Sequence, residues 1–85
     1  MKKIELKELR GKIDSVDSKI IELVKERFSL TKKISTVKRR MNLPKIDKVR
    51  ESDIISALCK KNKKIDKKAV SDIYRAIFRH SRKQQ

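Results

Sequence analysis

The chain has 85 residues and a formal net charge of +15, and 36% of its residues are apolar while 44% are charged. This length fits one small domain spanning residues 1–85, and so few apolar residues predict a thin core that needs a partner. The single cysteine, Cys59, excludes an intramolecular disulfide and, with one histidine, a metal site; no apolar run could span a membrane. We expect a soluble, cytoplasmic protein without a bound metal.

The 26 basic residues are spread along the whole chain, and a basic nucleic-acid-binding domain is one interpretation of their charge. However, the aromatic residues are only Phe28, Tyr74 and Phe78, which are not spaced to stack bases, and no zinc or glycine-loop signature occurs. We therefore interpret the charge as a lysine-rich solvated surface and expect no specific nucleic-acid partner.

The first predicted helix spans about residues 5–41. Its apolar residues follow at intervals of three and four when Arg27 is counted among them, and such a repeat is typical of a helix that packs against another helix. These residues, called the seam below, are Leu6, Leu9, Ile13, Val16, Ile20, Leu23, Leu30, Ile34, Val37 and Met41. Pro44 ends the helix, because the residue before a proline avoids the helical conformation.

Two shorter helices are predicted at about 47–61 and 66–84. Both follow the same four letters, 45-KIDK-48 and 64-KIDK-67, in which the aspartate can cap the helix and the isoleucine can pack on its first turn. With no alternating pattern of strand type, the predicted fold class is all-α, with one long N-terminal helix and two shorter ones.

The length of the first helix indicates a homodimer. About 37 residues at ~1.5 Å each make a rod of roughly 55 Å, whereas a compact chain of this size is only about 30 Å across. Two short helices cannot cover such a rod, so we expect the long helices of two chains to pair in an intertwined dimer with two equivalent sites.

Arg27 lies within the apolar seam, where a charge is unfavourable unless a negative group meets it. Lys38 follows on nearly the same helix face, about 16 Å further along, so the two cations bracket a space that suits a small dianion. Arg10 lies about 100° around the helix from Arg27 and reaches that space only across a dimer. Arg27 could instead pair with Asp17 or Glu51 and set the register of the helices.

Two further groups of polar residues stand out in the second and third predicted helices. Asp47, Arg50 and Glu51 share one face at the start of the second helix, where free backbone N–H groups suit oxygen atoms of a ligand. The apolar stripe of the third helix continues into Ser81 and Gln85, which offer neutral hydrogen-bond donors. Each residue also has a simpler explanation, as a helix cap or as ordinary surface, but together they indicate one pocket for a dicarboxylate.

Four parts of the sequence, 9-LRGKIDSVDSKIIELVKER-27, Lys38, 44-PKIDKVRE-51 and 78-FRHSRKQQ-85, resemble in order and spacing the all-helical chorismate mutases of the AroQ class. The resemblance covers almost the whole chain. It implies an intertwined dimer of three-helix chains that converts chorismate to prephenate for phenylalanine and tyrosine synthesis, with no cofactor. In this family, Arg10 is the arginine donated across the dimer, Arg27 holds a substrate carboxylate, and Lys38 contacts the ether oxygen and a carboxylate.

The resemblance also implies roles for the later polar residues. Asp47, through its backbone, and Glu51 lie near the substrate hydroxyl, and Arg50 is a supporting arginine. Ser81 lies close to a carboxylate. Gln85 faces the ether oxygen opposite Lys38.

Two related interpretations remain. Isochorismate pyruvate lyase shares the fold, but the Arg50–Glu51 pair favours the mutase, because Glu51 suits a contact to the substrate hydroxyl. The chain could also be the mutase part of a larger enzyme. Its extent from Met1 to Gln85 leads us to expect a free-standing protein.

Overall fold

The computed structural model describes residues 2–84 and contains three helices. They are α1 (Lys3–Arg40), α2 (Lys48–Lys61) and α3 (Lys67–Lys83). No strand occurs within the described residues, which confirms the predicted all-α fold. Each helix begins within two residues, and ends within one residue, of the bounds expected from the sequence. In residues 2–84, no helix is both long and apolar enough to cross a membrane.

The two short helices begin at the predicted aspartate caps. Asp47 Oδ1 accepts a hydrogen bond from the backbone N–H of Arg50 at 3.0 Å, and Asp66 Oδ1 accepts one from the N–H of Lys68 at 3.4 Å. Each bond satisfies a first-turn N–H group that has no partner within its own helix. Helix α1 ends at a turn in which Asn42 takes a φ of 56°, a left-handed conformation that asparagine tolerates better than most residues.

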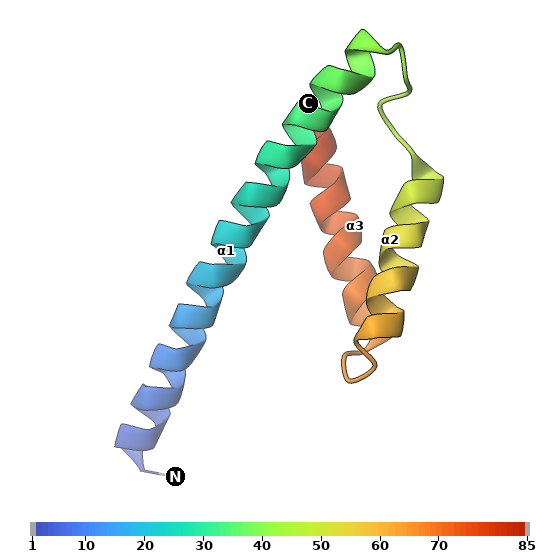
Figure 1. Ribbon diagram of the computed structural model, residues 1–85. Coiled ribbons are helices and arrows are strands. Elements are labelled where there is room, and N and C mark those ends of the chain that lie inside the picture. Colours follow the sequence, from blue (N-terminus) through green and yellow to red (C-terminus); the bar gives the residue numbers. More distant parts are fainter. Residues whose placement is uncertain (1, 85) are drawn as a thin grey trace.

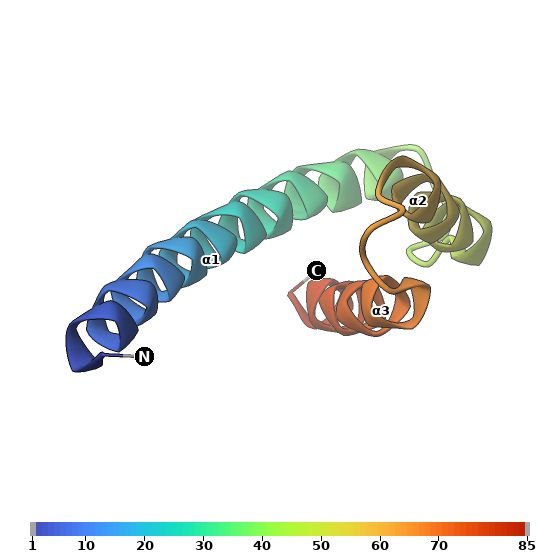
Figure 2. The same cartoon turned by 90° about the horizontal axis from the view of Figure 1, so that it is seen from below.

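The three helices form an open, elongated arrangement. Helices α2 and α3 make a hairpin that lies beside the C-terminal half of α1 (Figure 1). Helix α3 packs against both other helices, whereas α1 and α2 make no packing contact within the described residues. Seen from below, α1 runs past the hairpin and its N-terminal half extends away from it (Figure 2). The extents are 59 × 24 × 17 Å, so the chain does not form a compact globule.

The core of the single chain is small. The buried apolar side chains are Val70 and Phe78 of α3, each 6% exposed, and the buried polar ones are Ser35 of α1 and Ser81 of α3. The radius of gyration is 16.8 Å, compared with about 12 Å for a compact domain of this length. As the composition predicted, the packing within one chain is limited to the surfaces around α3.

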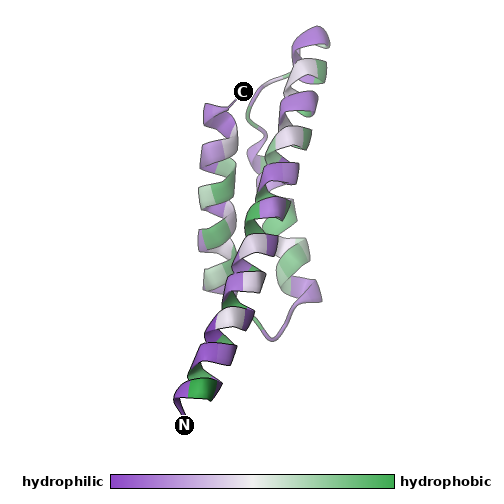
Figure 3. Ribbon diagram, turned by 90° about the vertical axis from the view of Figure 1, so that its left-hand side faces the viewer, coloured by the Kyte–Doolittle hydropathy of each residue, from purple (hydrophilic) through white to green (hydrophobic). Residues whose placement is uncertain are grey.

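Helix α1 presents two distinct stripes. The stripe that lies against α3 has Ser35 buried and five half-buried residues: Val24, Arg27, Phe28, Thr31 and Lys38. In this half of α1 the seam lies roughly 100° around the helix from that stripe. The seam stays open along the whole helix, with Ile13 57%, Leu23 64% and Ile34 54% exposed. Figure 3 shows hydrophobic residues interleaved with hydrophilic ones along α1.

Candidate functional site

The predicted site residues lie on three helices, and most of them are near one end of the molecule. Lys38 lies in the last turn of α1, Asp47 caps the start of α2, and Ser81 lies near the end of α3. The end of α3 lies beside the C-terminal half of α1 (Figure 1). Arg10 lies apart from them, exposed and about 25 Å along α1 from Arg27.

Arg27 is half-buried and lies against two aromatic rings of α3. Its Cζ atom is 5.3 Å from the ring centroid of Phe78 and 5.7 Å from that of Tyr74. The two rings meet edge to face, with centroids 5.9 Å apart and planes at 67°. This geometry gives a cation–π attraction and keeps the guanidinium at the surface of α3. Within residues 2–84, no carboxylate lies within ion-pair distance of Arg27.

Glu51, one of the two carboxylates considered as partners of Arg27, forms a different ion pair. Arg82 Nη2 lies 2.5 Å from both carboxylate oxygens of Glu51, and the side chains of the two residues are 32% and 24% exposed. The alternative in which Arg27 pairs with Glu51 is therefore wrong. Sequence reasoning missed Arg82, because it is 31 residues from Glu51. In the sequence, only its position could have indicated that Arg82 lies near the site: it follows Phe78 by four residues, at the edge of the apolar stripe of α3.

Lys38 is half-buried, and its ammonium group contacts the loop that follows α1. The Nζ atom donates to the backbone carbonyl of Lys45 at 3.3 Å, and the Lys38 carbonyl accepts from the N–H of Leu43 at 2.8 Å. A small hollow of about 150 Å³ lies here, lined partly by Lys38, Leu43 and Ser35. Two of the three ammonium hydrogens remain for other acceptors.

Three further predicted residues differ in how the structure holds them. Arg50 is exposed, and its side chain makes no hydrogen bond or ion pair to any other described residue. Ser81 is only 5% exposed, and its hydroxyl donates to the carbonyl of Ile77 at 2.9 Å. Ser81 thus differs from the expected free donor, because only its oxygen lone pairs remain available. Gln85, the other predicted donor on α3, lies outside the described residues.

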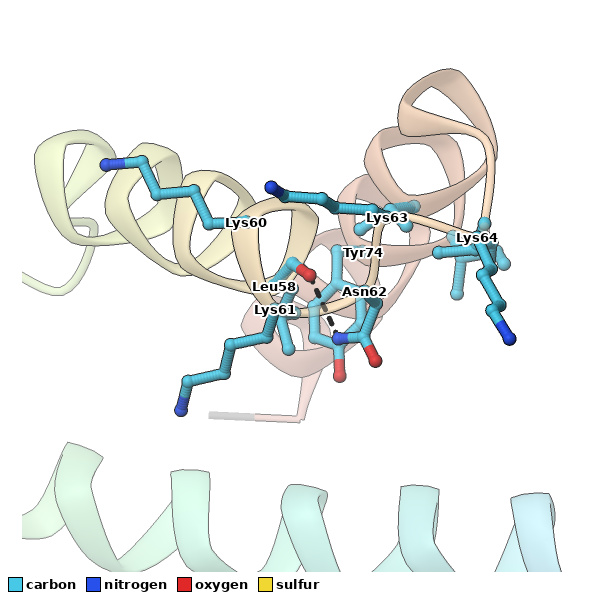
Figure 4. A pocket seen from close by; sticks show the side chains of 10 residues that line it. Leu58, Lys60, Lys61, Asn62, Lys63, Lys64 and Tyr74 are labelled. Carbon is cyan, nitrogen blue, oxygen red and sulfur yellow. Dashed lines mark hydrogen bonds between the residues drawn. The ribbon is translucent and has the colours of Figure 1, made fainter.

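A larger hollow of about 840 Å³ lies at the turn between α2 and α3, away from these residues. Its apolar lining includes Leu58, Val70, Ile73 and Tyr74. In Figure 4, lysine side chains around the turn extend outward, and the Asn62 side-chain amide donates to the Leu58 carbonyl at 2.9 Å. None of the predicted site residues lines this hollow.

The site combines fixed cations with little nucleophilic or metal-binding chemistry. Arg27, Lys38 and Arg50 carry positive charge, while Asp47 is engaged as a cap and Glu51 is engaged by Arg82. Within the described residues, no group of three or more His, Cys, Asp or Glu side chains could hold a metal ion. This arrangement suits the binding of a compact dianion by electrostatic attraction and directed hydrogen bonds.

Comparison with known proteins finds a matching family model and similar proteins. A family model described as "Chorismate mutase type II" matches residues 9–85. A protein named chorismate mutase from Methanocaldococcus jannaschii is 35% identical over 81 residues, which are 92% of this chain and 81% of the relative. A protein from Aquifex aeolicus named bifunctional chorismate mutase/prephenate dehydratase is 38% identical over 79 residues. They make up 87% of this chain but only 22% of that relative.

Proposed function

The chain belongs to the type II chorismate mutase family, and we propose that it converts chorismate to prephenate in phenylalanine and tyrosine biosynthesis. The observation that carries this proposal is Arg27. It is a half-buried cation that contacts two aromatic rings of α3 and has no carboxylate partner among residues 2–84. A carboxylate of the substrate would supply the missing negative charge.

The proposed reaction suits a site built from hydrogen-bond donors. In this intramolecular rearrangement one C–O bond breaks while one C–C bond forms, and neither a nucleophile, a base nor a cofactor is required. The enzyme contributes by holding the compact chair-like conformer of the substrate. It also places donors where the breaking ether oxygen gains negative charge. An acceleration of about 10⁶ requires roughly 8 kcal/mol, which positioning and two or three such donors can supply together.

Each site residue has a proposed role. Arg27 binds one substrate carboxylate, Lys38 binds a carboxylate and the ether oxygen, and Gln85 donates to the ether oxygen from the opposite side. Near the substrate hydroxyl, Asp47 acts through its backbone and Glu51 through its carboxylate. The remaining roles complete the binding site: Arg50 supports it from α2, Ser81 lies close to a carboxylate, and Arg10 of the partner subunit reaches it across the dimer.

The proposed active form is a homodimer. The seam of α1 is exposed along its whole length, and burying such an apolar stripe favours association. Arg27 and Lys38 lie on α1 at the border between the open seam and the stripe that contacts α3. A second copy packed on the seam would therefore close the site beside them, and Arg10 of the partner subunit would add a third cation. The cytoplasmic location and the single free-standing domain stay predictions from the sequence.

The first test is the loss of the ultraviolet absorbance of chorismate on addition of the purified protein, with the product identified as prephenate. We expect saturable turnover that falls by about 10²–10³-fold in Arg27→Ala and Lys38→Ala, because each removes a donor to developing or fixed negative charge. Isochorismate is assayed in parallel, and release of pyruvate from it, without mutase turnover, would assign the lyase activity instead.

An Arg27→Leu variant separates a substrate-binding role from a structural one. Leucine restores the apolar repeat, so the free energy of unfolding should stay the same or rise while turnover is lost. Turnover equal to that of the unchanged protein in this variant would contradict the assigned role of Arg27. The absence of turnover in the unchanged protein, at a concentration where dimers form, would overturn the proposed function itself.

A further inference from the structure

We propose that Arg82 is a positioning residue that holds Glu51 for the substrate hydroxyl and neutralises its charge. This inference rests on the proposed function, since it assigns to Glu51 a contact with the substrate. It adds a residue that the family resemblance did not include. The carrying observation is the contact of Arg82 Nη2 with both carboxylate oxygens of Glu51, at 2.5 Å each.

The contact fixes the position of Glu51 between two helices. Glu51 lies in the first turn of α2 and Arg82 in the last turns of α3, and both are mostly shielded from water, with 24% and 32% of their side chains exposed. The other ion pairs of residues 2–84 join residues three or four apart on one helix, so this is the one that links two helices there. Burial of two partners lowers screening by water and limits the rotamers of Glu51.

The ion pair leaves Glu51 able to accept another hydrogen bond. Each carboxylate oxygen has two lone pairs, and Arg82 occupies one on each atom, so both oxygens can still accept from a hydroxyl. The Nε atom of Arg82 is buried and has no hydrogen-bond partner in the described part of the chain. The guanidinium therefore keeps one buried donor that is not used within the described residues.

The Arg82–Glu51 ion pair also determines the net charge of the proposed substrate site. An unpaired Glu51 would place a negative charge among the residues proposed to bind a dianion, and like charges at short distance oppose binding. Arg82 cancels that charge, so the positive charges of Arg27 and Lys38 are left for the two substrate carboxylates. Loss of Arg82 should accordingly weaken substrate binding as well as misplace Glu51.

The neighbouring arginines provide a matched control. Arg75, Arg79 and Arg82 line one groove of about 410 Å³ between α2 and α3, together with Glu51. The Nε atom of Arg75 donates to the Ser71 hydroxyl at 3.0 Å, whereas Arg79 is exposed and makes no ion pair among the described residues. Replacing Arg79 removes the same charge from the same groove without touching Glu51.

The test is a double-mutant cycle of Arg82→Met and Glu51→Gln, with Arg79→Met as the control, measured as kcat and KM for chorismate. We expect Arg82→Met to lower kcat/KM by about 10–100-fold, with a rise in KM, because a small misplacement of a contacting group carries a cost of this size. Arg82→Lys should recover part of the loss, and Arg79→Met should change kcat/KM by less than about twofold. In the Glu51→Gln background, Arg82→Met should cause little further loss.

Three outcomes would overturn the inference. The first is an effect of Arg82→Met no larger than that of Arg79→Met, and the second is a loss of the same size with and without the Glu51 carboxylate. If Arg82→Met does not fold, as judged by helical circular dichroism, Arg82→Gln becomes the deciding variant, because it also removes the charge, and kinetics in it equal to those of Arg79→Met are the third outcome. If the unchanged protein had no mutase turnover, both the proposed function and this inference would be wrong. The three outcomes above would contradict only the role of Arg82.

Discussion

The two stripes of α1 differ in what covers them. The stripe against α3 includes the buried Ser35 and the half-buried Arg27 and Lys38, so α3 and the loop after α1 already cover part of it within one chain. The seam is more apolar, yet its residues are 40–64% exposed. The more hydrophobic face is thus the one that the chain leaves open. An amphipathic helix buries its apolar stripe against another surface, so this difference supports the proposed dimer, in which a second molecule covers the seam.

The position of the cations follows from this division. Arg27 belongs to the seam by its spacing, but its guanidinium turns toward Phe78 and Tyr74 of α3. The aromatic rings stabilise the cation from one side and leave Arg27 half-buried. In the proposed dimer, the chain that covers the seam would build the rest of the site, so the activity would depend on assembly.

Mixing two inactive variants, Arg10→Ala and Arg27→Ala, tests whether a second chain covers the seam, and it has the largest expected effect. If Arg10 acts across the dimer, each variant alone lacks one cation in every site. A mixed dimer then has one complete site and one that lacks both. Random exchange of subunits would restore about a quarter of the sites. The measurement is chorismate turnover after co-refolding of equal amounts, relative to the unmixed variants. If both residues served one chain's own site, mixing would restore no activity.

The local part of this structure could be predicted from the sequence, because its signals lie within a few residues. Asp47 and Asp66 cap helices at the expected places, and Pro44 follows the end of α1. The side-chain partners across helices could not be predicted in the same way. Which ring lies under Arg27, and which cation meets Glu51, depends on the rotation of α3 about its axis. The spacing of apolar residues along one helix does not specify that angle closely enough to identify these partners.

The charged residues of the candidate site illustrate the same limit. The sequence marked Arg27 as an exception to the seam and predicted a ligand carboxylate as its partner, with Asp17 or Glu51 as the alternative. Within the described residues, aromatic rings of α3 lie beside Arg27 and Arg82 engages Glu51, so the pairing of Arg27 with Glu51 is wrong. The exception was therefore visible from one sequence, but its compensation was not, because three kinds of group can stabilise a guanidinium: a carboxylate, an aromatic face or a ligand.

A Phe78→Leu substitution tests the contact between the covered stripe of α1 and α3. Leucine keeps an apolar side chain at this position, which is 6% exposed, so the free energy of unfolding should fall by only about 1–2 kcal/mol. The ring under Arg27 is lost, and with it an attraction of about 0.5–1 kcal/mol, so KM should rise by roughly two- to fivefold. Urea unfolding and steady-state kinetics measure the two effects separately. An unchanged KM would mean that Phe78 packs α3 but does not hold Arg27.

Gly11→Ala tests the remaining face of α1, and its expected effect is the smallest. Gly11 lies in the helix interior, about 200° around the axis from Leu9 and Ile13 of the seam. A Cβ atom added there meets nothing within 4 Å. Alanine should therefore raise the free energy of unfolding by about 0.5–1 kcal/mol, through helix propensity alone.

Thermal unfolding at several protein concentrations measures this stabilisation, and we expect the same shift of the unfolding temperature at each concentration. A destabilisation that grows as the protein is diluted would place another chain against Gly11. The partner would then cover the back of α1 as well as the seam, and the division into one open and one covered stripe would have to be redrawn.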